Sequence, residues 1–290
     1  MGNLLIIGET GLLGSAVKEI GKTYFDKIFG TYNTNAKPDL VKLDVKDRKA
    51  VFDLVKEVNP SLVVDTHALN NVDYCEQHPE EAWEINVDGT KNIAEASKLV
   101  GAKYVFISSD YVFSGSKMSY SEKDKPDPIN YYGKTKYAAE LMLQALDINY
   151  IVLRTSSLYG SRSSSDKKSF PFFVAEMLQS GKEVKVAYDQ YVSPTNVDDL
   201  AKAIFELAKQ DAKGIFHATG PETITKYDFA QKVAKVLDLD VKLIKPVSSA
   251  ELNLVAKRPN KVVLETTKLM RVAKVRISGL DEKLPIIFKK

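Results

Sequence analysis

The stretch Asn3-Leu-Leu-Ile-Ile7, followed directly by Gly8-Glu-Thr-Gly11-Leu-Leu-Gly14, decides the fold. A short apolar run of this kind is typical of a buried strand, and the glycines turn it into a helix that we expect to run to about Lys22. Three glycines at this spacing permit a tight turn, a close approach of the backbone to a diphosphate and a close helix–strand contact. The helix amino end supplies N–H donors for the anion. The spacing G-x-x-G-x-x-G differs from the commonest dinucleotide fingerprint, and the alternative is an ordinary strand-to-helix turn that binds no phosphate.

The same alternation of strand and helix continues along the chain. Further strand-like runs lie near 27–32, 40–43, 61–65, 103–108 and 149–154, and helical stretches near 47–58, 79–99 and 131–146. This order predicts an α/β fold with a Rossmann-type, doubly wound parallel sheet. Asn196 is expected to cap a helix that runs to about Lys209, and 214–218 to form one more strand.

Two domains are expected from this reading. Residues 1–154 plus about 196–219 would form the dinucleotide-binding domain, and about 155–195 plus 220–290 a smaller substrate-binding lid. The stretch 161–168 is the most loop-like, either a mobile flap or an ordinary surface loop.

A second informative stretch is Tyr132-Gly-Lys-Thr-Lys136, on the helix expected near 131–146. Residues at i and i+4 share one helix face, about 5–6 Å apart at Cβ. A free phenol has a pKa near about 10, and we expect the Lys136 ammonium to lower the pKa of Tyr132 toward neutrality. Ser109, after the apolar run 103–108, would hold a carbonyl oxygen beside the phenol. This group predicts proton transfer at a carbonyl that also exchanges a hydride; a packing tyrosine and a solvated lysine are the alternative.

The end of the second expected strand bears on the choice of cofactor. Sites selective for NAD usually place a carboxylate there to bind the ribose 2′-hydroxyl. The stretch Gly30-Thr-Tyr-Asn-Thr-Asn35 has no acid, and Lys37 follows. Asn33 and Lys37 tolerate or attract a 2′-phosphate, so we expect NADPH, with NADH as the alternative.

Composition excludes several other classes of protein. The net charge is +3, from 41 basic and 38 acidic residues that are well mixed along the chain, so neither a nucleic acid nor a membrane surface is an expected partner. No apolar run is long enough to cross a membrane. Because the chain begins directly with a strand and has one cysteine, Cys75, we expect a cytoplasmic protein. His67, Cys75 and His78 lie close in sequence but fit no zinc-ligand spacing, so we expect no metal. Trp83 and His217 are expected in the core.

Together with four further segments, these motifs resemble the extended short-chain dehydrogenase/reductases, and most closely the dTDP-4-dehydrorhamnose reductase family. The further segments are Ser108-Ser-Asp-Tyr-Val-Phe-Ser-Gly115, Arg154-Thr-Ser-Ser-Leu-Tyr-Gly160, Ser193-Pro-Thr195 with Asp199-Leu-Ala201, and Lys257-Arg-Pro-Asn260. The resemblance therefore covers nearly the whole chain.

The resemblance implies roles for individual residues. Tyr132 would be the general acid, Lys136 would tune it and bind the nicotinamide ribose, and Ser109, where the family usually has threonine, would orient the ketone. Tyr111, Asn130 and Arg258 would contact the sugar or its diphosphate, although Arg258 could equally be a surface arginine. The implied cofactor contacts are Gly8, Thr10, Gly11, Leu12, Leu13, Gly14, Asn33, Asp44, Val45, Ala68, Tyr132 and Lys136. For Asp44 a plain turn or capping role is the alternative.

Three departures from the family pattern concern the pocket. The usual Arg-Thr-Ser-Trp is here Arg154-Thr-Ser-Ser157, and the usual Gly-x-Pro-Thr is Val192-Ser-Pro-Thr195. After the fourth expected strand, Asp65-Thr-His-Ala68 replaces Asn-Ala-Ala-Ala. These changes predict a reshaped sugar pocket.

The resemblance implies NADPH-dependent reduction of the 4-keto group of a nucleotide-sugar. The first candidate reaction is the conversion of dTDP-4-dehydro-L-rhamnose to dTDP-L-rhamnose. A homodimer is one expected oligomeric state. A nucleotide-sugar epimerase or dehydratase is one alternative. Dehydratases typically carry Asp-Glu after the active-site hydroxyl, whereas here Asp110 precedes Tyr111. The other alternative is a non-catalytic regulatory subunit like the methionine adenosyltransferase β subunit.

Overall fold

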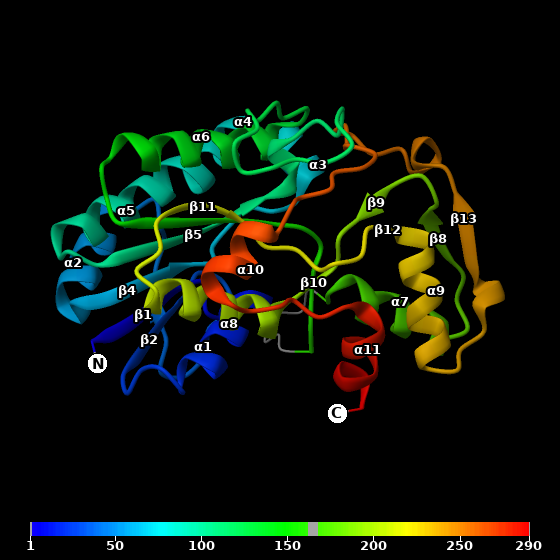
Figure 1. Ribbon diagram of the computed structural model, residues 1–290, viewed down its shortest axis with the longest axis horizontal. Helices are drawn as coiled ribbons and strands as arrows, with labels where there is room; N and C mark the ends of the chain where they lie inside the picture. The colour runs from blue at the N-terminus through cyan, green and yellow to red at the C-terminus, as the bar shows by residue number, and fades with distance from the viewer. Residues whose placement is uncertain (1, 162–167, 290) are drawn as a thin grey trace.

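A seven-stranded parallel sheet forms the centre of the protein, with the strand order β11-β6-β5-β4-β1-β2-β3 (Figure 1). The structure, a computed structural model, describes residues 2–161 and 168–289, so the predicted loop at 161–168 lies almost wholly outside the described residues. The strands are β1 (Asn3–Ile7), β2 (Ile28–Tyr32), β3 (Val41–Lys42), β4 (Pro60–Asp65), β5 (Lys103–Ser109), β6 (Tyr150–Thr155) and β11 (Gly214–His217). The order reverses between β1 and β4, which is the point where sheets of this kind bind ligands. The prediction of a doubly wound sheet is confirmed.

Helices cover both faces of this sheet. One face packs against α1 (Leu12–Gly21), α8 (Val197–Lys209) and α10 (Thr267–Ala273), and the other against α2 (Arg48–Val58), α5 (Thr90–Leu99) and α6 (Tyr131–Ala145). Figure 1 shows α1 and α8 below the sheet and α5 and α6 above it. Because both faces are covered, the strands are continuous apolar runs without polar alternation. The side chains of β1 from Leu4 to Ile7 are at most 1% exposed.

Local sequence signals explain where two of these helices begin. The Asn196 side chain accepts from the backbone N–H groups of Asp198 (3.1 Å) and Asp199 (3.3 Å), and α8 follows, as predicted. Asn130 caps α6 in the same way, accepting from the backbone N–H of Gly133 at 2.8 Å. Both side chains satisfy N–H groups that the first helical turn leaves without a partner.

The single helix predicted over 79–99 is wrong in detail. The chain instead forms α4 (Pro79–Trp83), a π-helical turn η1 (Glu84–Gly89) and then α5. The short helix α3 (Val72–Gln77), which precedes them, was not predicted. Trp83, the last residue of α4, is 41% exposed and does not belong to the core, contrary to expectation. His217, in contrast, is fully buried as predicted.

The remaining elements form a smaller unit at the right of Figure 1, with a hydrophobic cluster of its own. Two chain segments contribute to it. Its helices are α7 (Phe170–Gln179), α9 (Lys226–Val236) and α11 (Leu280–Phe288), and its short strands pair β8 (Val184–Ala187) with β13 (Ile244–Val247), β9 (Tyr191–Val192) with β12 (Ile224–Thr225), and β7 (Leu158–Tyr159) with β10 (Thr195–Asn196). Among the described residues there are also the short 3-10 turns η2 (Asp110–Val112), η3 (Val241–Leu243) and η4 (Ser249–Leu252). The separate cluster fits the expected lid, while the division into two domains stays a prediction.

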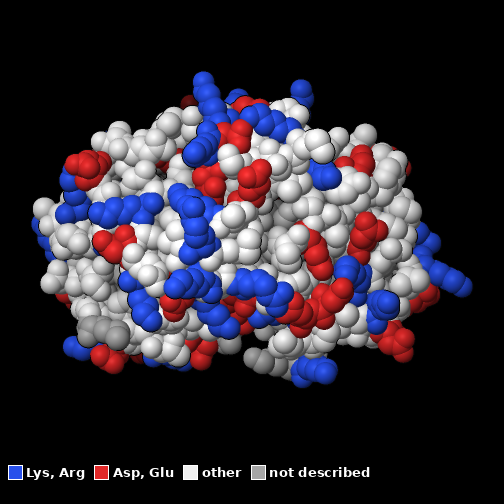
Figure 2. Space-filling model, in the orientation of Figure 1, with Lys and Arg blue, Asp and Glu red and all other residues white. Residues whose placement is uncertain are grey.

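The surface carries charges of both signs. On the face drawn in Figure 2, the side chains of Lys and Arg are interspersed with those of Asp and Glu, and no broad region of one sign is visible. Within the described part of the chain, no helix is both long and apolar enough to cross a membrane.

Candidate active site

The glycine-rich turn leads from β1 into α1 at the reversal point of the sheet. Gly8 has φ +80°, and the Gly11 N–H closes the turn on the Gly8 carbonyl at 3.0 Å. A Cβ at Gly14 would lie 2.3 Å from the Gly8 oxygen, so only glycine allows the helix to start this close to the strand. Gly11 is the N-cap of α1 and offers no side-chain cap, which leaves the first-turn N–H groups directed at whatever binds there. This backbone cradle fits a dinucleotide diphosphate.

The other predicted cofactor contacts lie in loops at the same edge of the sheet. Asn33 follows β2 and is exposed, and Ala68 follows β4 and is partly exposed. Asp44 follows β3, and its carboxylate accepts from the Lys46 backbone N–H at 3.0 Å, which is a turn contact. Val45 is buried beside Gly89, where a Cβ would lie 2.5 Å from it. Leu13 packs in the core, with Leu12 packed against it, and Thr10 is buried, so these three support the turn. The structure thus gathers the predicted positions at one edge.

The three predicted catalytic side chains come together where β5 ends and α6 begins. Ser109 is the last residue of β5 and is one of the groups that act on the buried Tyr132 phenol, whose ring packs edge-on against the Tyr111 ring with the centres 6.2 Å apart. The Ser109 hydroxyl donates to Asp110 at 3.0 Å and accepts from the Tyr111 backbone N–H at 3.1 Å. Lys136 lies one helical turn further along α6, with its Nζ 4.4 Å from the centre of the Phe106 ring.

The protonation of Tyr132 differs from the sequence expectation. Burial, followed by the charge of Asp110, raises the pKa of the Tyr132 phenol above its ordinary value, and the nearby Ser109 hydroxyl only partly offsets this. Burial also lowers the pKa of Lys136 to about 8, against the effects of Asp65 and Glu140. The expected lowering of the phenol pKa by Lys136 is therefore wrong for this structure, because desolvation outweighs the effect of a lysine that lies over Phe106. The phenol carries its proton at neutral pH.

Asp110 is a site residue that sequence reasoning did not single out as functional. It is 7% exposed, and burial raises the pKa of its carboxyl to about 6 despite hydrogen bonds from Ser156 (2.6 Å) and Ser109 (3.0 Å). A perturbed carboxyl beside a candidate acid is typical of active sites. Its position directly after Ser109 was visible in the sequence, but its burial was not.

A cationic group lies next to these residues. Arg258 makes a bidentate pair with Asp73, at 2.7 and 2.9 Å, and its charge lowers the pKa of Tyr111 against the larger effect of burial. Lys226, the first residue of α9, donates to Gln190 at 2.9 Å. Burial and the nearby charge of Arg258 lower the pKa of Lys226, and Asp110 raises it. Arg258 and Asp110 are thus near enough to Lys226 to act on its charge. Sequence reasoning predicted Arg258 but missed Lys226, for which no local motif exists.

The Asn130 side chain has other hydrogen-bond partners than the sugar or diphosphate contact that was predicted for it. It is fully buried, and its amide donates to the Lys257 carbonyl at 2.9 Å while its oxygen caps α6. Because both ends of the side chain bond to the protein, Asn130 positions the helix that carries Tyr132 and does not face a ligand here. Asn86 acts similarly, since its side chain bonds to the backbone of Leu69 and to Thr135 on α6.

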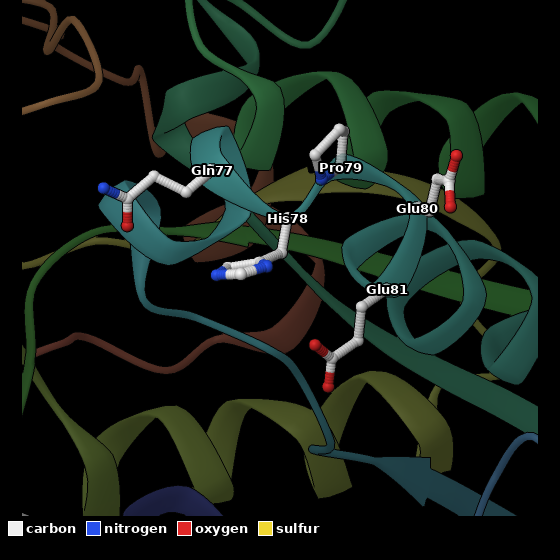
Figure 3. A pocket seen from close by; sticks show the side chains of 5 residues that line it. All are labelled: Gln77, His78, Pro79, Glu80 and Glu81. Atoms are coloured by element: carbon white, nitrogen blue, oxygen red, sulfur yellow. The ribbon is translucent and has the colours of Figure 1, made fainter.

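Other polar groups in this region do not form a second site. In the described ranges, no group of three or more His, Cys, Asp or Glu residues could hold a metal ion. A surface depression is lined by residues from Gln77 to Glu81, and Figure 3 shows that their side chains point in different directions. The His78 ring there stacks on Tyr74 with their centres 4.1 Å apart.

A parallel sheet with this reversal point, a glycine-rich diphosphate cradle and a Ser–Tyr–Lys group together define the extended short-chain dehydrogenase/reductases. The model of the family described as "RmlD substrate binding domain" matches residues 2–290. The chain belongs to the dTDP-4-dehydrorhamnose reductase family, and it is an oxidoreductase that uses a nicotinamide dinucleotide.

Known relatives agree with this assignment. A crystal structure of dTDP-4-dehydrorhamnose reductase from Bacillus anthracis in complex with NADP is similar at a TM-score of 0.89 and 31% identity, covering 100% of this chain and 99% of that one. Methionine adenosyltransferase 2 subunit beta of Bos taurus is 32% identical over 92% of this chain and 81% of its own length. A probable low-salt glycan biosynthesis reductase of Haloferax volcanii is 30% identical over 91% and 90%.

Proposed function

We propose that this protein reduces the 4-keto group of a nucleotide-sugar with NADPH, and that dTDP-4-dehydro-L-rhamnose is the substrate, giving dTDP-L-rhamnose. The observation that carries the proposal is the placement of a buried, protonated Tyr132 phenol at the end of β5, where Ser109 accepts from the Tyr111 backbone N–H and the Tyr111 ring packs edge-on against the Tyr132 ring. The Ser109 hydroxyl, which donates to Asp110 at 3.0 Å without substrate, can turn to donate to a bound carbonyl oxygen alongside the Tyr132 phenol. A reduction needs such a donor, because the oxygen gains negative charge as the carbonyl carbon is reduced.

The chain's own residues divide the work as follows. Tyr132 gives its proton to the substrate oxygen, and Ser109 holds that oxygen in place. Asp110 orients the Ser109 hydroxyl through the bond at 3.0 Å. Lys136 contributes a positive charge from the same helix face, and the bound cofactor supplies the hydride. The raised pKa of Tyr132 supports its role as an acid, since the group enters the reaction protonated.

Two features support the choice of cofactor. The glycine-rich turn from Gly8 to Gly14 leaves room and N–H donors for the diphosphate. The loop after β2 carries Asn33 and Lys37 and lacks a carboxylate at the position where NAD-selective sites use one. The similar structure from Bacillus anthracis was solved with NADP, which agrees with a 2′-phosphate in this family.

Lys226 and Arg258 support a diphosphate-bearing substrate. Two cations held close together repel each other, and a bound dianion relieves that repulsion. A guanidinium can also bind phosphate oxygens bidentately, as Arg258 now binds the Asp73 carboxylate. We propose that the nucleotide-sugar diphosphate lies against these two side chains, with its sugar turned toward Ser109 and Tyr132. A cytoplasmic location and a homodimer stay predictions.

One second candidate has an observation in its favour. Methionine adenosyltransferase 2 subunit beta is 32% identical to this chain, so a regulatory subunit is a real alternative to an enzyme. An epimerase or dehydratase is less well supported, because the acid pair expected after Ser109 is incomplete: Tyr111 occupies the second position.

A turnover assay tests these readings together. The protein is mixed with NADPH and dTDP-4-dehydro-L-rhamnose, and both the NADPH absorbance and the sugar product are measured. A reductase consumes one NADPH for each sugar reduced. Sugar conversion without NADPH loss would indicate an epimerase or dehydratase. If the protein binds the cofactor but neither consumes NADPH nor converts the sugar, the result would favour a different keto sugar or the regulatory subunit.

A further inference from the structure

The guanidinium of Arg258 is held by a carboxylate from a distant part of the chain. Asp73, on α3, accepts from Nη1 at 2.7 Å and from Nη2 at 2.9 Å, and the two residues are 185 positions apart. Burial raises the pKa of the Asp73 carboxyl, but hydrogen bonds from Arg258 and from the Ala256 backbone N–H outweigh burial and hold that pKa below its ordinary value. The carboxylate is therefore charged at neutral pH, and the contact is a bidentate ion pair.

The backbone on both sides of Arg258 is fixed by other residues. On one side, the Lys257 carbonyl accepts at 2.9 Å from the amide of Asn130, the cap of α6. On the other side, the Asn260 carbonyl accepts at 2.7 Å from the backbone N–H of Tyr191, in strand β9 of the smaller unit. Because these two bonds flank Arg258, they hold the main chain there without the ion pair. What the ion pair adds is the direction of the guanidinium.

The ion pair leaves a second edge of the guanidinium for another anion. An arginine side chain has five N–H groups in one plane. Nη1 of Arg258 donates to Asp73 and to the Ala256 carbonyl, the latter at 2.6 Å, and Nη2 donates to Asp73. The hydrogens that these contacts do not use, on Nε and Nη2, lie on the other edge of the plane and form a fork that suits two phosphate oxygens. Asp73 and a phosphate can therefore bind Arg258 at the same time.

The ion pair lies against the start of α6. Asp73 belongs to α3, and the Glu76 carboxylate, from the same helix, accepts from the Tyr131 backbone N–H at 2.8 Å. Tyr132, the candidate acid, is the next residue of α6. A phosphate group bound to Arg258 is therefore close to the end of α6 that carries the phenol.

We propose that Asp73 is a positioning residue of the substrate site, which holds one edge of the Arg258 guanidinium and so directs the other edge at the diphosphate of a nucleotide-sugar. The nature of this ligand rests on the function proposed above. The opposite role, in which Asp73 competes with the phosphate for Arg258, predicts an effect of opposite sign. Removal of a negative charge beside an anion site strengthens anion binding by Coulomb attraction. Weaker binding without the Asp73 charge therefore indicates lost orientation.

Calorimetric titration with dTDP, and separately with NADPH, tests this role in the full-length protein. The proteins compared are the parent, Asp73→Asn, Arg258→Met and the double variant. Asp73→Asn keeps an oxygen that can accept from the Ala256 N–H, whose bond to Oδ1 is 2.9 Å long, and removes the charge and one acceptor of the pair. Glu80→Gln, which removes an exposed carboxylate from α4, is the matched control for a change in charge.

The expected losses of affinity are specific to dTDP. Arg258→Met should weaken dTDP binding by about ten- to a hundredfold, and Asp73→Asn by about three- to tenfold, because a charge-assisted hydrogen bond is lost or misdirected. Glu80→Gln should not weaken it, and NADPH affinity should stay unchanged in all variants. In the Arg258→Met background, Asp73→Asn should have no further effect, since an orienting residue acts through the group that it orients.

Three results would overturn the proposal. The first is unchanged or tighter dTDP binding by Asp73→Asn, which would mean no role or competition. The second is an equal loss of dTDP and NADPH affinity, which would mean a general structural defect. The third is a pair of losses that add in the double variant, because Asp73 would then act independently of Arg258.

The same proteins separate this proposal from the proposed reaction. Where the parent reduces the keto sugar, Asp73→Asn should raise KM and leave kcat nearly unchanged, because it alters binding and not proton transfer. If the parent binds dTDP but reduces no sugar, the proposed reaction fails and the binding data still decide the role of Asp73. A parent that binds no dTDP would overturn the proposal, since Arg258 would then hold no nucleoside diphosphate.

Discussion

Replacing Asp110 by asparagine should make the protein more stable relative to the parent as pH rises from about 4 to 7, although Asp110 lies in the candidate active site. Burial raises the pKa of this carboxyl from 3.8 to about 6 in the folded protein. A folded-state pKa above the unfolded value means that the folded protein holds the proton more tightly. The contribution of Asp110 to stability is therefore complete below about pH 4 and is lost as pH rises through about 6.

The magnitude follows from the same values. A difference of about 2 in pKa corresponds to about 3 kcal/mol, at about 1.36 kcal/mol for each pKa unit. No discount for solvent is needed, because the side chain is 7% exposed. The asparagine variant has no proton to lose. Because the unfolded-state carboxyl is already about half ionised at pH 4, the free energy of unfolding of Asp110→Asn, relative to the parent, should rise by about 2 kcal/mol between pH 4 and pH 7.

Urea unfolding at a series of pH values measures this difference directly, and comparing differences cancels any constant effect of the amide on packing. Asp88→Asn, which removes an exposed carboxylate, is the control for general charge effects. A relative stability of Asp110→Asn that does not change between pH 4 and pH 7 would refute the reasoning. The expected cost is lower turnover, because Ser109 loses the carboxylate that orients its hydroxyl.

Three further predictions concern the proposed reaction. Tyr132→Phe should lower turnover by about 10²–10⁴-fold and retain NADPH binding, whereas Tyr131→Phe, on the neighbouring residue, should not lower turnover. The rate of NADPH consumption measures this, and a Tyr132→Phe rate within a few-fold of the parent would mean that another group is the acid. Asn33→Asp should shift the preference from NADPH toward NADH, because a carboxylate accepts from a 2′-hydroxyl and repels a 2′-phosphate. Fluorescence titration of both cofactors measures the ratio of their affinities, and an unchanged ratio would mean that the ribose binds elsewhere. Lys226→Met should weaken the binding of dTDP by about ten- to a hundredfold, which is the contribution of a charge-assisted hydrogen bond. Lys232→Met, on the same helix, should have little effect. Calorimetry measures both affinities, and equal losses of affinity would exclude a specific role for Lys226.

Local patterns predicted most of the fold and part of the site. The apolar runs of β1, β4 and β5, the glycine spacing after β1 and the cap at Asn196 are short-range signals, and each element formed within a residue or two of its expected position. The same holds for Ser109, Tyr132 and Lys136, because strand ends and helix periodicity place them on one edge of the sheet. The break at the π turn was missed, since the contacts of Asn86 with Leu69 and Thr135 involve residues 17 and 49 positions away.

What the sequence determined by itself is thus the order of the elements, the sheet edge that carries the site and the residue types available there. The tertiary structure decided the state of those residues. It buried Asp110 and turned Lys136 toward Phe106. It also paired Arg258, whose charge acts on Lys226, with Asp73, which lies 185 residues away in the sequence. The physical reason is that backbone sterics and side-chain periodicity act over a few residues. Desolvation and charge depend instead on which distant groups surround a side chain, and only the completed fold defines that.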